Sequence, residues 1–226
     1  MTQNNFQFTD WGLTDYEEAL QHQEVLFQKN IDNKKTNLPS ENHLIFCEHP
    51  HVYTLGKSGN ENNMLLNFIQ LQAANAKFVR TTRGGDITYH GPGQLVGYPI
   101  FDLENFNLGL KQYIFKIESA IIKLLALYGI AAARLAGATG VWLDPATPQA
   151  RKICAIGVRS AHFVTMHGFA LNVNTDLTYF NYINPCGFTD KGVTSMQKES
   201  GQNIDLQDVK NNLKNIFTQV FLFSDK

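Results

Sequence analysis

RGGDITYHGPGQ, residues 83–94, is the most informative stretch of this 226-residue sequence. It holds four glycines and one proline, and the apolar segments KFVRTT and LVGYPIF lie on either side of it. Glycine adopts positive φ angles and lets the backbone approach other atoms closely, so this composition predicts a long loop between two buried strands. The polar residues between the glycines favour a binding loop over an ordinary turn. The spacing does not match the dinucleotide-binding motif G-x-G-x-x-G.

Strands and helices interleave around this loop without a regular β-α-β period or an internal repeat. Periodic apolar residues predict four helices: one from a Thr14–Glu17 capping box to about Lys29, then 65–76, 108–128 and 206–220 with Asp205 as cap. The polar segment 30–42 is predicted to be a surface loop. Short apolar runs predict strands at 43–48, 51–56, 77–82 and in the segments LVGYPIF, GVWLD, RKICAIGVRS and HFVTMHGFALNVN. The pattern is typical of an α+β or mixed α/β fold.

Composition excludes several classes of protein. The chain is 43% hydrophobic with 16 Phe, which indicates a packed core. Its 19 basic and 20 acidic residues give a net charge of -1, so no overall field favours nucleic acid or an anionic membrane. The first residues lack the pattern of a signal or transit peptide, and no apolar run approaches a membrane span. Three cysteines without a Cys-x-x-Cys pair fit a reducing cytoplasm.

The three cysteines differ in their surroundings. Cys47 in LIFC and Cys154 in ICAIG lie in apolar strands and are predicted to be core residues. Cys186 in INPCGF stands between Pro185 and Gly187, a setting suited to an exposed nucleophile, although exposed cysteines also occur without function. Local chemistry therefore leaves both interpretations of Cys186 open.

A nucleophilic thiol needs a helper, because its reference pKa of about 8.5 leaves it mostly protonated at neutral pH. Lys152, His90 and His167 are the candidates. Residues of these types could instead bind a metal ion, and Cys47, His49 and His51 are the candidates. Pro50 interrupts their strand, and no second ligand cluster has metal spacing, so the sequence argues against a metal site.

Four blocks taken in order resemble the signature of a known family: RGGDITYHGPGQ, RKICAIGVR, HGFALNVNTDL and NYINPCGF. The family is that of the lipoyl(octanoyl) transferases, the octanoyl-acyl carrier protein: protein N-octanoyltransferases of lipoate biosynthesis. The resemblance covers roughly residues 13–197. It implies one catalytic domain over residues 1–226, with a mixed β-sheet flanked by helices as in the biotin and lipoate protein ligases.

The resemblance also implies a reaction and a set of site residues. An octanoyl group passes from acyl carrier protein to a cysteine, and then to a lysine ε-amine of a lipoyl domain, such as those of 2-oxoacid dehydrogenase E2 subunits and the glycine cleavage H protein. By motif position Cys186 is the acyl-thioester nucleophile and Lys152 its partner. No cofactor or metal is implied, and the protein is expected to be a cytoplasmic monomer that binds neither nucleic acid nor membrane. The expected acyl-binding residues are Arg83, Gly84, Gly85, Asp86, Ile87, Thr88, Tyr89, His90, Ala155, Ile156, Gly157, His167, Gly168, Phe169 and Ala170.

Three departures from the family pattern are mild. Asp86 occupies a variable place in the RGG block, the segment after Lys152 reads ICAIG, and the 30–42 loop is long enough to alter partner docking. Two rival functions stay open: an ATP-dependent lipoate protein ligase, which forms an acyl-adenylate and needs no nucleophilic cysteine, and a non-enzymatic acyl-binding module. Hydrolysis of the thioester is conceivable as a side activity. Exchange of one thioester for another is nearly balanced in energy, so a cysteine captures the acyl group without ATP.

Overall fold

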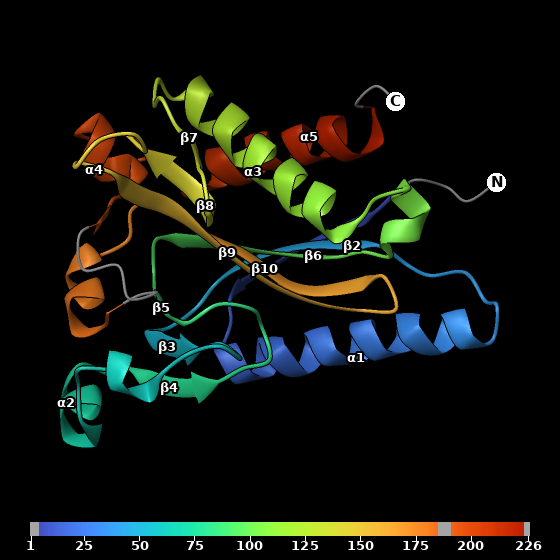
Figure 1. Ribbon diagram of the computed structural model, residues 1–226, viewed down its shortest axis with the longest axis horizontal. Coiled ribbons are helices and arrows are strands. Elements are labelled where there is room, and N and C mark those ends of the chain that lie inside the picture. The colour runs from blue at the N-terminus through green and yellow to red at the C-terminus, as the bar shows by residue number, and fades with distance from the viewer. Residues whose placement is uncertain (1–4, 185–190, 224–226) are drawn as a thin grey trace.

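The computed structural model describes residues 5–184 and 191–223, which form a large mixed sheet with helices on both faces (Figure 1). The order of the large sheet is β1-β2-β6-β10-β9-β8-β7; β1 runs parallel to β2, and β11 pairs in parallel with β9. These strands are β1 (Gln7–Leu13), β2 (His43–Glu48), β6 (Gln94–Ile100), β7 (Ala133–Leu135), β8 (Ala138–Leu143), β9 (Arg151–Ala161), β10 (Val164–Asn172) and β11 (Gly192–Val193).

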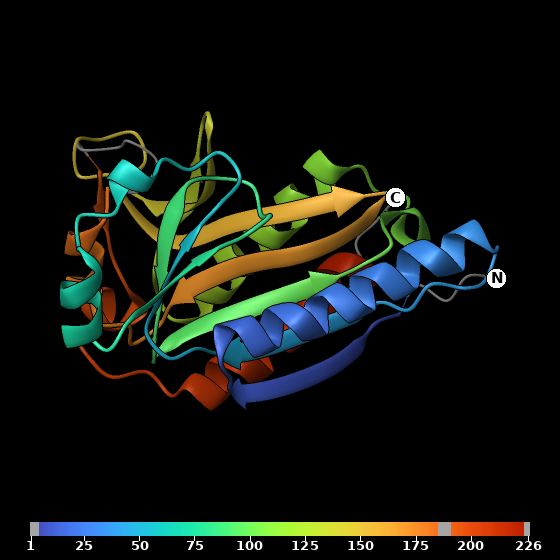
Figure 2. The same ribbon diagram turned by 90° about the horizontal axis from the view of Figure 1, so that it is seen from below.

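A second, three-stranded sheet lies at one end of the molecule, next to α2 (Figure 2). Its order is β4-β3-β5, with bounds β3 (Val52–Leu55), β4 (Lys77–Arg80) and β5 (Ile87–His90). The helices are α1 (Tyr16–Lys35), α2 (Phe68–Ala73), α3 (Leu110–Leu127), α4 (Met196–Ser200) and α5 (Leu206–Leu222), with the short 3-10 helices η1 (Glu61–Asn63), η2 (Leu103–Phe106) and η3 (Leu177–Tyr182).

Both faces of the large sheet are covered, α1 on one side and α3 with α5 on the other (Figure 1). The strand β2 shows how the sequence achieves this, because successive side chains of a strand point to opposite faces. Leu44 and Phe46 pack in the core with α3 and α5, whereas Ile45 and Cys47 pack against Ala19 of α1. A strand that is buried on both faces has apolar residues at successive positions, as the LIFC segment of β2 does.

The helix α1 is longer than predicted, and its cap is a different residue. Asp15, rather than Thr14, accepts a hydrogen bond from the Glu17 amide, at 2.9 Å. The helix runs past the predicted end at Lys29 to Lys35, because Ile31 packs with Met166 of β10. Tertiary burial thus overrides the polar composition of this segment.

The predicted 83–94 loop contains a strand, and this is a correction to its sequence-based interpretation. Residues 87–90 form β5, which pairs antiparallel with β3, so only the two ends of the glycine-rich stretch are loops. The amino-terminal β1 was not predicted either. The strand 43–48 and the cap of α5 at Asp205 are confirmed. In the part of the chain that the structure covers, no helix is long and apolar enough to cross a membrane.

Candidate active site

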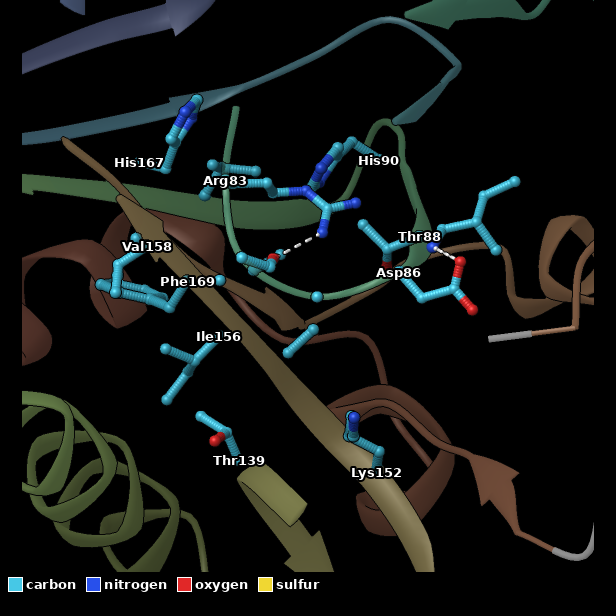
Figure 3. Close-up of a pocket in the computed structure, with 18 of the residues that line it drawn as sticks. Arg83, Asp86, Thr88, His90, Thr139, Lys152, Ile156, Val158, His167 and Phe169 are labelled. Atoms are coloured by element: carbon cyan, nitrogen blue, oxygen red, sulfur yellow. Dashed lines mark hydrogen bonds between the residues drawn. The ribbon is translucent and has the colours of Figure 1, made fainter. Parts of the chain in front are cut away.

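A cavity of about 510 Å³ lies where the 83–90 segment crosses the hairpin of β9 and β10 (Figure 3). It reaches Tyr16 of α1 on one side of the sheet and Ile114 of α3 on the other. All of the acyl-binding residues expected from the resemblance line this cavity except Tyr89, and Lys152 lines it as well. Cys186 lies outside the described residues.

Four small residues form the floor of the cavity on the α1 side; we call this surface the trough. Ala155 pairs across the strands with Ala170, and Gly157 pairs with Gly168. Ala170 packs in the same cluster as Ala19 of α1, which places the trough on the α1 face. Side chains this short leave space above the sheet where larger ones would fill it. The trough is therefore shaped for an unbranched apolar group lying along the strands.

The glycine-rich segment closes over the trough because β9 provides room for it. The Gly84 amide donates to the Val158 carbonyl at 2.9 Å, which ties the segment to the edge of β9. A Cβ atom on Gly157 would lie 2.8 Å from the Gly84 carbonyl oxygen. That atom belongs to the backbone, so the segment itself would have to move.

Gly157→Val is therefore expected to lift the 83–86 segment and to lower kcat/KM for acyl transfer by at least about tenfold, with a loss of roughly 1–3 kcal/mol in stability. Steady-state kinetics and thermal denaturation measure the two effects. Gly109→Ala is the matched control, because a Cβ atom at Gly109 meets only Gln112, at 3.8 Å. If Gly157→Val had wild-type kinetics, the close contact between Gly157 and the Gly84 carbonyl oxygen would not be needed for the site.

Two polar side chains hold the shape of the glycine-rich segment. Arg83 is buried, and its Nη2 donates to the Thr54 carbonyl oxygen at 2.5 Å and to Thr54 Oγ1 at 2.9 Å. Asp86 accepts hydrogen bonds from the Asn60 amide at 3.1 Å and from Asn63 Nδ2 at 2.5 Å. Both side chains thus tie the segment to the small sheet and to η1, and both residues line the cavity.

Tyr89 stands apart from the other expected acyl-binding residues, because its side chain packs away from the cavity. The ring stacks on Tyr179, at 4.9 Å between centroids, and its hydroxyl lies 2.7 Å from His51 Nδ1. Tyr89 thereby joins the small sheet to η3, which precedes the segment of Cys186. Tyr89 therefore supports the packing of these elements and does not line the cavity.

A β-bulge decides where the Lys152 side chain points. Ile153 and Cys154 both pack in the α3/α5 core, although neighbouring residues of a regular strand face opposite sides. The register between β8 and β9 shifts here, which resets the alternation. Lys152 consequently shares a face with the trough, and its Nζ lies 4.6 Å from the centre of the Trp142 ring.

The chain on both sides of residues 185–190 is anchored at the cavity. Before this segment, the Asn184 amide donates to the Asn63 carbonyl at 2.9 Å, and Phe180 lines the cavity. After it, Val193 pairs with Lys152, and the Thr194 amide donates to the Lys152 carbonyl at 2.9 Å. Described residues on both sides of this segment therefore line the cavity, and those after it pair with the strand of Lys152.

The two histidines of the cavity are uncharged at neutral pH. Burial, together with the nearby Arg83 guanidinium, lowers the pKa of both His90 and His167 to about 3. Gln94 Nε2 donates to the Tyr89 carbonyl, so its amide oxygen faces His90 Nδ1, at 2.8 Å, and that nitrogen carries the ring proton. A neutral imidazole cannot lower a thiol pKa by its charge. Of the three candidate helpers, Lys152 is thus the one that can act as a cation.

The two described cysteines are core residues. Cys47 and Cys154 are buried, and burial raises the pKa of each thiol well above its ordinary value. Across residues 5–184 and 191–223, no group of three or more His, Cys, Asp or Glu residues could hold a metal ion.

Sequence motifs did not reveal every residue of the lining. Trp142, Tyr16, Tyr98 and Val96 also line the cavity, yet each belongs to a helix or an apolar strand with no distinguishing motif. Only the strand register and the packing of α1 bring them to the cavity.

The sheet, the covering glycine-rich segment and the lysine beside the trough define a catalytic domain of the lipoate and biotin protein ligase fold. A bipartite lipoate protein ligase from Thermoplasma acidophilum matches 96% of this chain and 83% of its own, with a TM-score of 0.71 at 14% identity. Biotin protein ligase from Aquifex aeolicus, solved with biotin and ATP, matches 96% and 70%, with a TM-score of 0.54 at 12% identity. At these identities the likeness establishes the fold alone.

Sequence comparison identifies the family within this fold. The model of the lipoyl protein ligase A/B catalytic domain matches residues 15–218. The octanoyltransferase of Bacteroides fragilis strain YCH46 is 60% identical over 205 residues, which cover 91% of this chain and 93% of that protein. The chain belongs to the lipoyl protein ligase A/B catalytic domain family.

Proposed function

We propose that this protein transfers an octanoyl group from octanoyl-acyl carrier protein to a lysine of lipoyl domains, by way of a thioester on Cys186. The octanoyl transfer follows from the relatives called octanoyltransferase, the first of which is 60% identical over nearly the whole chain. That similarity is the observation that carries the proposal. The thioester and the roles of individual residues rest on the motif positions and on the chemistry of the cavity.

The shape of the cavity supports an eight-carbon chain as the group that is transferred. The trough is floored by small residues and bordered by Val96 and Ile87, so the chain can lie against an apolar surface. Burying roughly six methylenes at about 0.8 kcal/mol each gives an upper limit of about 5 kcal/mol of binding free energy. The alkyl chain has no polar atoms, so it gains its affinity from this surface rather than from hydrogen bonds.

Lys152 has two tasks in this mechanism. As an ammonium it stabilises the Cys186 thiolate, which attacks the donor thioester. The ammonium then gives its proton to the departing carrier sulfur, so the carrier leaves as a thiol and Lys152 becomes neutral. Once neutral it accepts a proton from the ammonium of the incoming lysine. The free amine then attacks the enzyme thioester, the bond to the Cys186 sulfur breaks, and the second N–H proton leaves with that sulfur as the thiol, which yields the amide. The second step runs downhill, because an amide is more stable than a thioester. The backbone amides of Gly85 and Asp86 are the candidates for stabilising the thioester oxygen, because the Gly84 amide already donates to the Val158 carbonyl.

The proposal extends to the organisation and partners of the protein. Residues 1–226 act as one catalytic domain and as a monomer, in a reducing cytoplasm that keeps the nucleophilic thiol free. The acceptors are lipoyl domains of 2-oxoacid dehydrogenase E2 subunits and of the glycine cleavage H protein. Acidic partners of this kind would be steered by lysines at the mouth of the cavity, where Lys191 lies.

Incubation with octanoyl-acyl carrier protein and no ATP is expected to add one octanoyl group to the protein. Intact-mass measurement detects the adduct, and peptide mapping should place it on Cys186. Addition of a lipoyl domain should then remove it and yield octanoyl-lysine. If no adduct forms and the lipoyl domain is acylated only when free octanoate and ATP are supplied, the protein is a ligase. If the octanoate is released as free acid instead, it is a hydrolase.

A further inference from the structure

The backbone of His167 is unusual for a strand residue. Its φ is 60°, in the left-handed region that a side chain other than glycine rarely adopts in a strand. Regular alternation would place the ring beside Phe169, which packs in the α3/α5 core. Figure 3 shows it instead on the side of Arg83 and His90, away from Phe169 and Val158. The positive φ thus turns the His167 ring to the face that carries the trough.

His167 stands at the end of the trough remote from Lys152. It pairs with Val158, directly after the pair of Gly157 with Gly168. The Gly84 amide closes the same end by its hydrogen bond to the Val158 carbonyl. The ring is 2% exposed and lines the cavity. A chain that starts near Lys152 and follows β9 therefore meets His167 last.

This closed end is polar, in contrast to the floor of the trough. Within the described part of the chain, the buried atoms His167 Nδ1 and Gln23 Nε2 have no hydrogen-bond partner. The two residues are neighbours, since the His167 amide donates to Gln23 Oε1 at 3.0 Å. His167 Nε2 lies 3.3 Å from Thr82 Oγ1, so the ring is held in place while Nδ1 is left without a partner. The ring therefore forms a fixed, buried wall at this end of the trough.

We propose that His167 sets the upper limit on the length of the acyl chain. From Ala155 to Val158, three strand steps of about 3.3 Å span roughly 10 Å. An extended octanoyl chain of seven carbon–carbon bonds, each about 1.5 Å and inclined to the chain axis, spans roughly 9 Å. Octanoyl therefore fits between the start of the trough and the ring, whereas two further carbons reach the ring. The inference rests on the proposed octanoyl transfer and deepens it.

The test compares octanoyl-, decanoyl- and dodecanoyl-acyl carrier protein as donors for the full-length enzyme. His167→Gly keeps the positive φ without strain and removes the ring. It is expected to raise the decanoyl-to-octanoyl ratio of kcat/KM by about tenfold, the size of effect that one or two methylenes have in a hydrophobic site. His167→Asn tolerates the same φ, keeps a polar group and should give a smaller rise. Ile114→Ala is the matched control, since Ile114 lines the part of the cavity on the α3 side.

Three outcomes would overturn the inference. One is a decanoyl-to-octanoyl ratio that stays at the wild-type value in His167→Gly, with folding checked by thermal denaturation; if that variant does not fold, His167→Asn decides in its place. A second is a ratio that rises in Ile114→Ala instead, because the chain would then lie on the α3 side. A third is a wild-type enzyme that uses both donors equally. Failure of the proposed function looks different, since the wild type would then accept no octanoyl group at all.

Discussion

Replacing Cys186 with serine is expected to abolish octanoyl transfer and to leave the fold intact. A serine hydroxyl is a far weaker nucleophile than a thiolate at neutral pH, so kcat should fall by at least about 10³-fold. The variant should carry no octanoyl adduct after incubation with the acyl donor. Intact-mass measurement and an assay of lipoyl-domain octanoylation provide the two readouts.

The two other cysteines serve as internal controls for this prediction. Cys47 and Cys154 are buried in the core, with pKa values raised by that burial, so neither should take over the role of Cys186. Cys47→Ala and Cys154→Ala are expected to lower stability by about 1 kcal/mol through lost packing, and to keep the adduct. An octanoyl adduct that maps to a residue other than 186 in Cys186→Ser, or its loss in either alanine variant that still folds, would show that the nucleophile has been misassigned.

Much of the fold could be predicted from local pattern. The apolar run 43–48 and the periodic residues of α3 and α5 gave elements close to those of the structure, because their burial is strong and regular. The strand β1 was missed, since QFTDWGL mixes polar and apolar residues and is held by its pairing with β2. The strand β5 was missed because the surrounding glycines dominate the local pattern.

The arrangement of the cavity depends on how distant segments pair and bend, which no single segment of the sequence reveals. The trough exists because the register of β9 and β10 sets Ala155 opposite Ala170 and Gly157 opposite Gly168. Lys152 faces the trough because of a bulge, and His167 does so because of a positive φ. Motif resemblance named these residues, but only the paired strands show which of them share one surface. The resemblance also named Tyr89 as an acyl-binding residue, whereas the structure places its ring in a stack with Tyr179.

Lys152→Ala is expected to slow octanoyl transfer by about 10²- to 10⁴-fold and to raise the pKa of the Cys186 thiol. The size follows from the loss of a general acid and base. The direction of the pKa change follows from charge: a nearby ammonium favours the thiolate, so its removal returns the thiol toward the reference value of about 8.5. His90 and His167 cannot compensate, because with pKa values near 3 they stay neutral throughout this range. The rate of iodoacetamide alkylation as a function of pH reports the thiol pKa directly.

Lys152→Arg separates the two tasks of the lysine. A guanidinium keeps the positive charge but does not give up its proton at neutral pH, so it can stabilise the thiolate and cannot accept a proton from the incoming amine. This variant should retain an alkylation profile close to that of the wild type and form the octanoyl adduct, yet pass it to the lipoyl domain at least about 10²-fold more slowly. Lys57→Ala removes an exposed lysine of the 56–60 loop and should leave both half-reactions unchanged. If Lys152→Ala alkylates with the wild-type pH profile, another group stabilises the thiolate. If Lys152→Arg transfers at the wild-type rate, the proton of the acceptor lysine leaves by a route that does not involve Lys152.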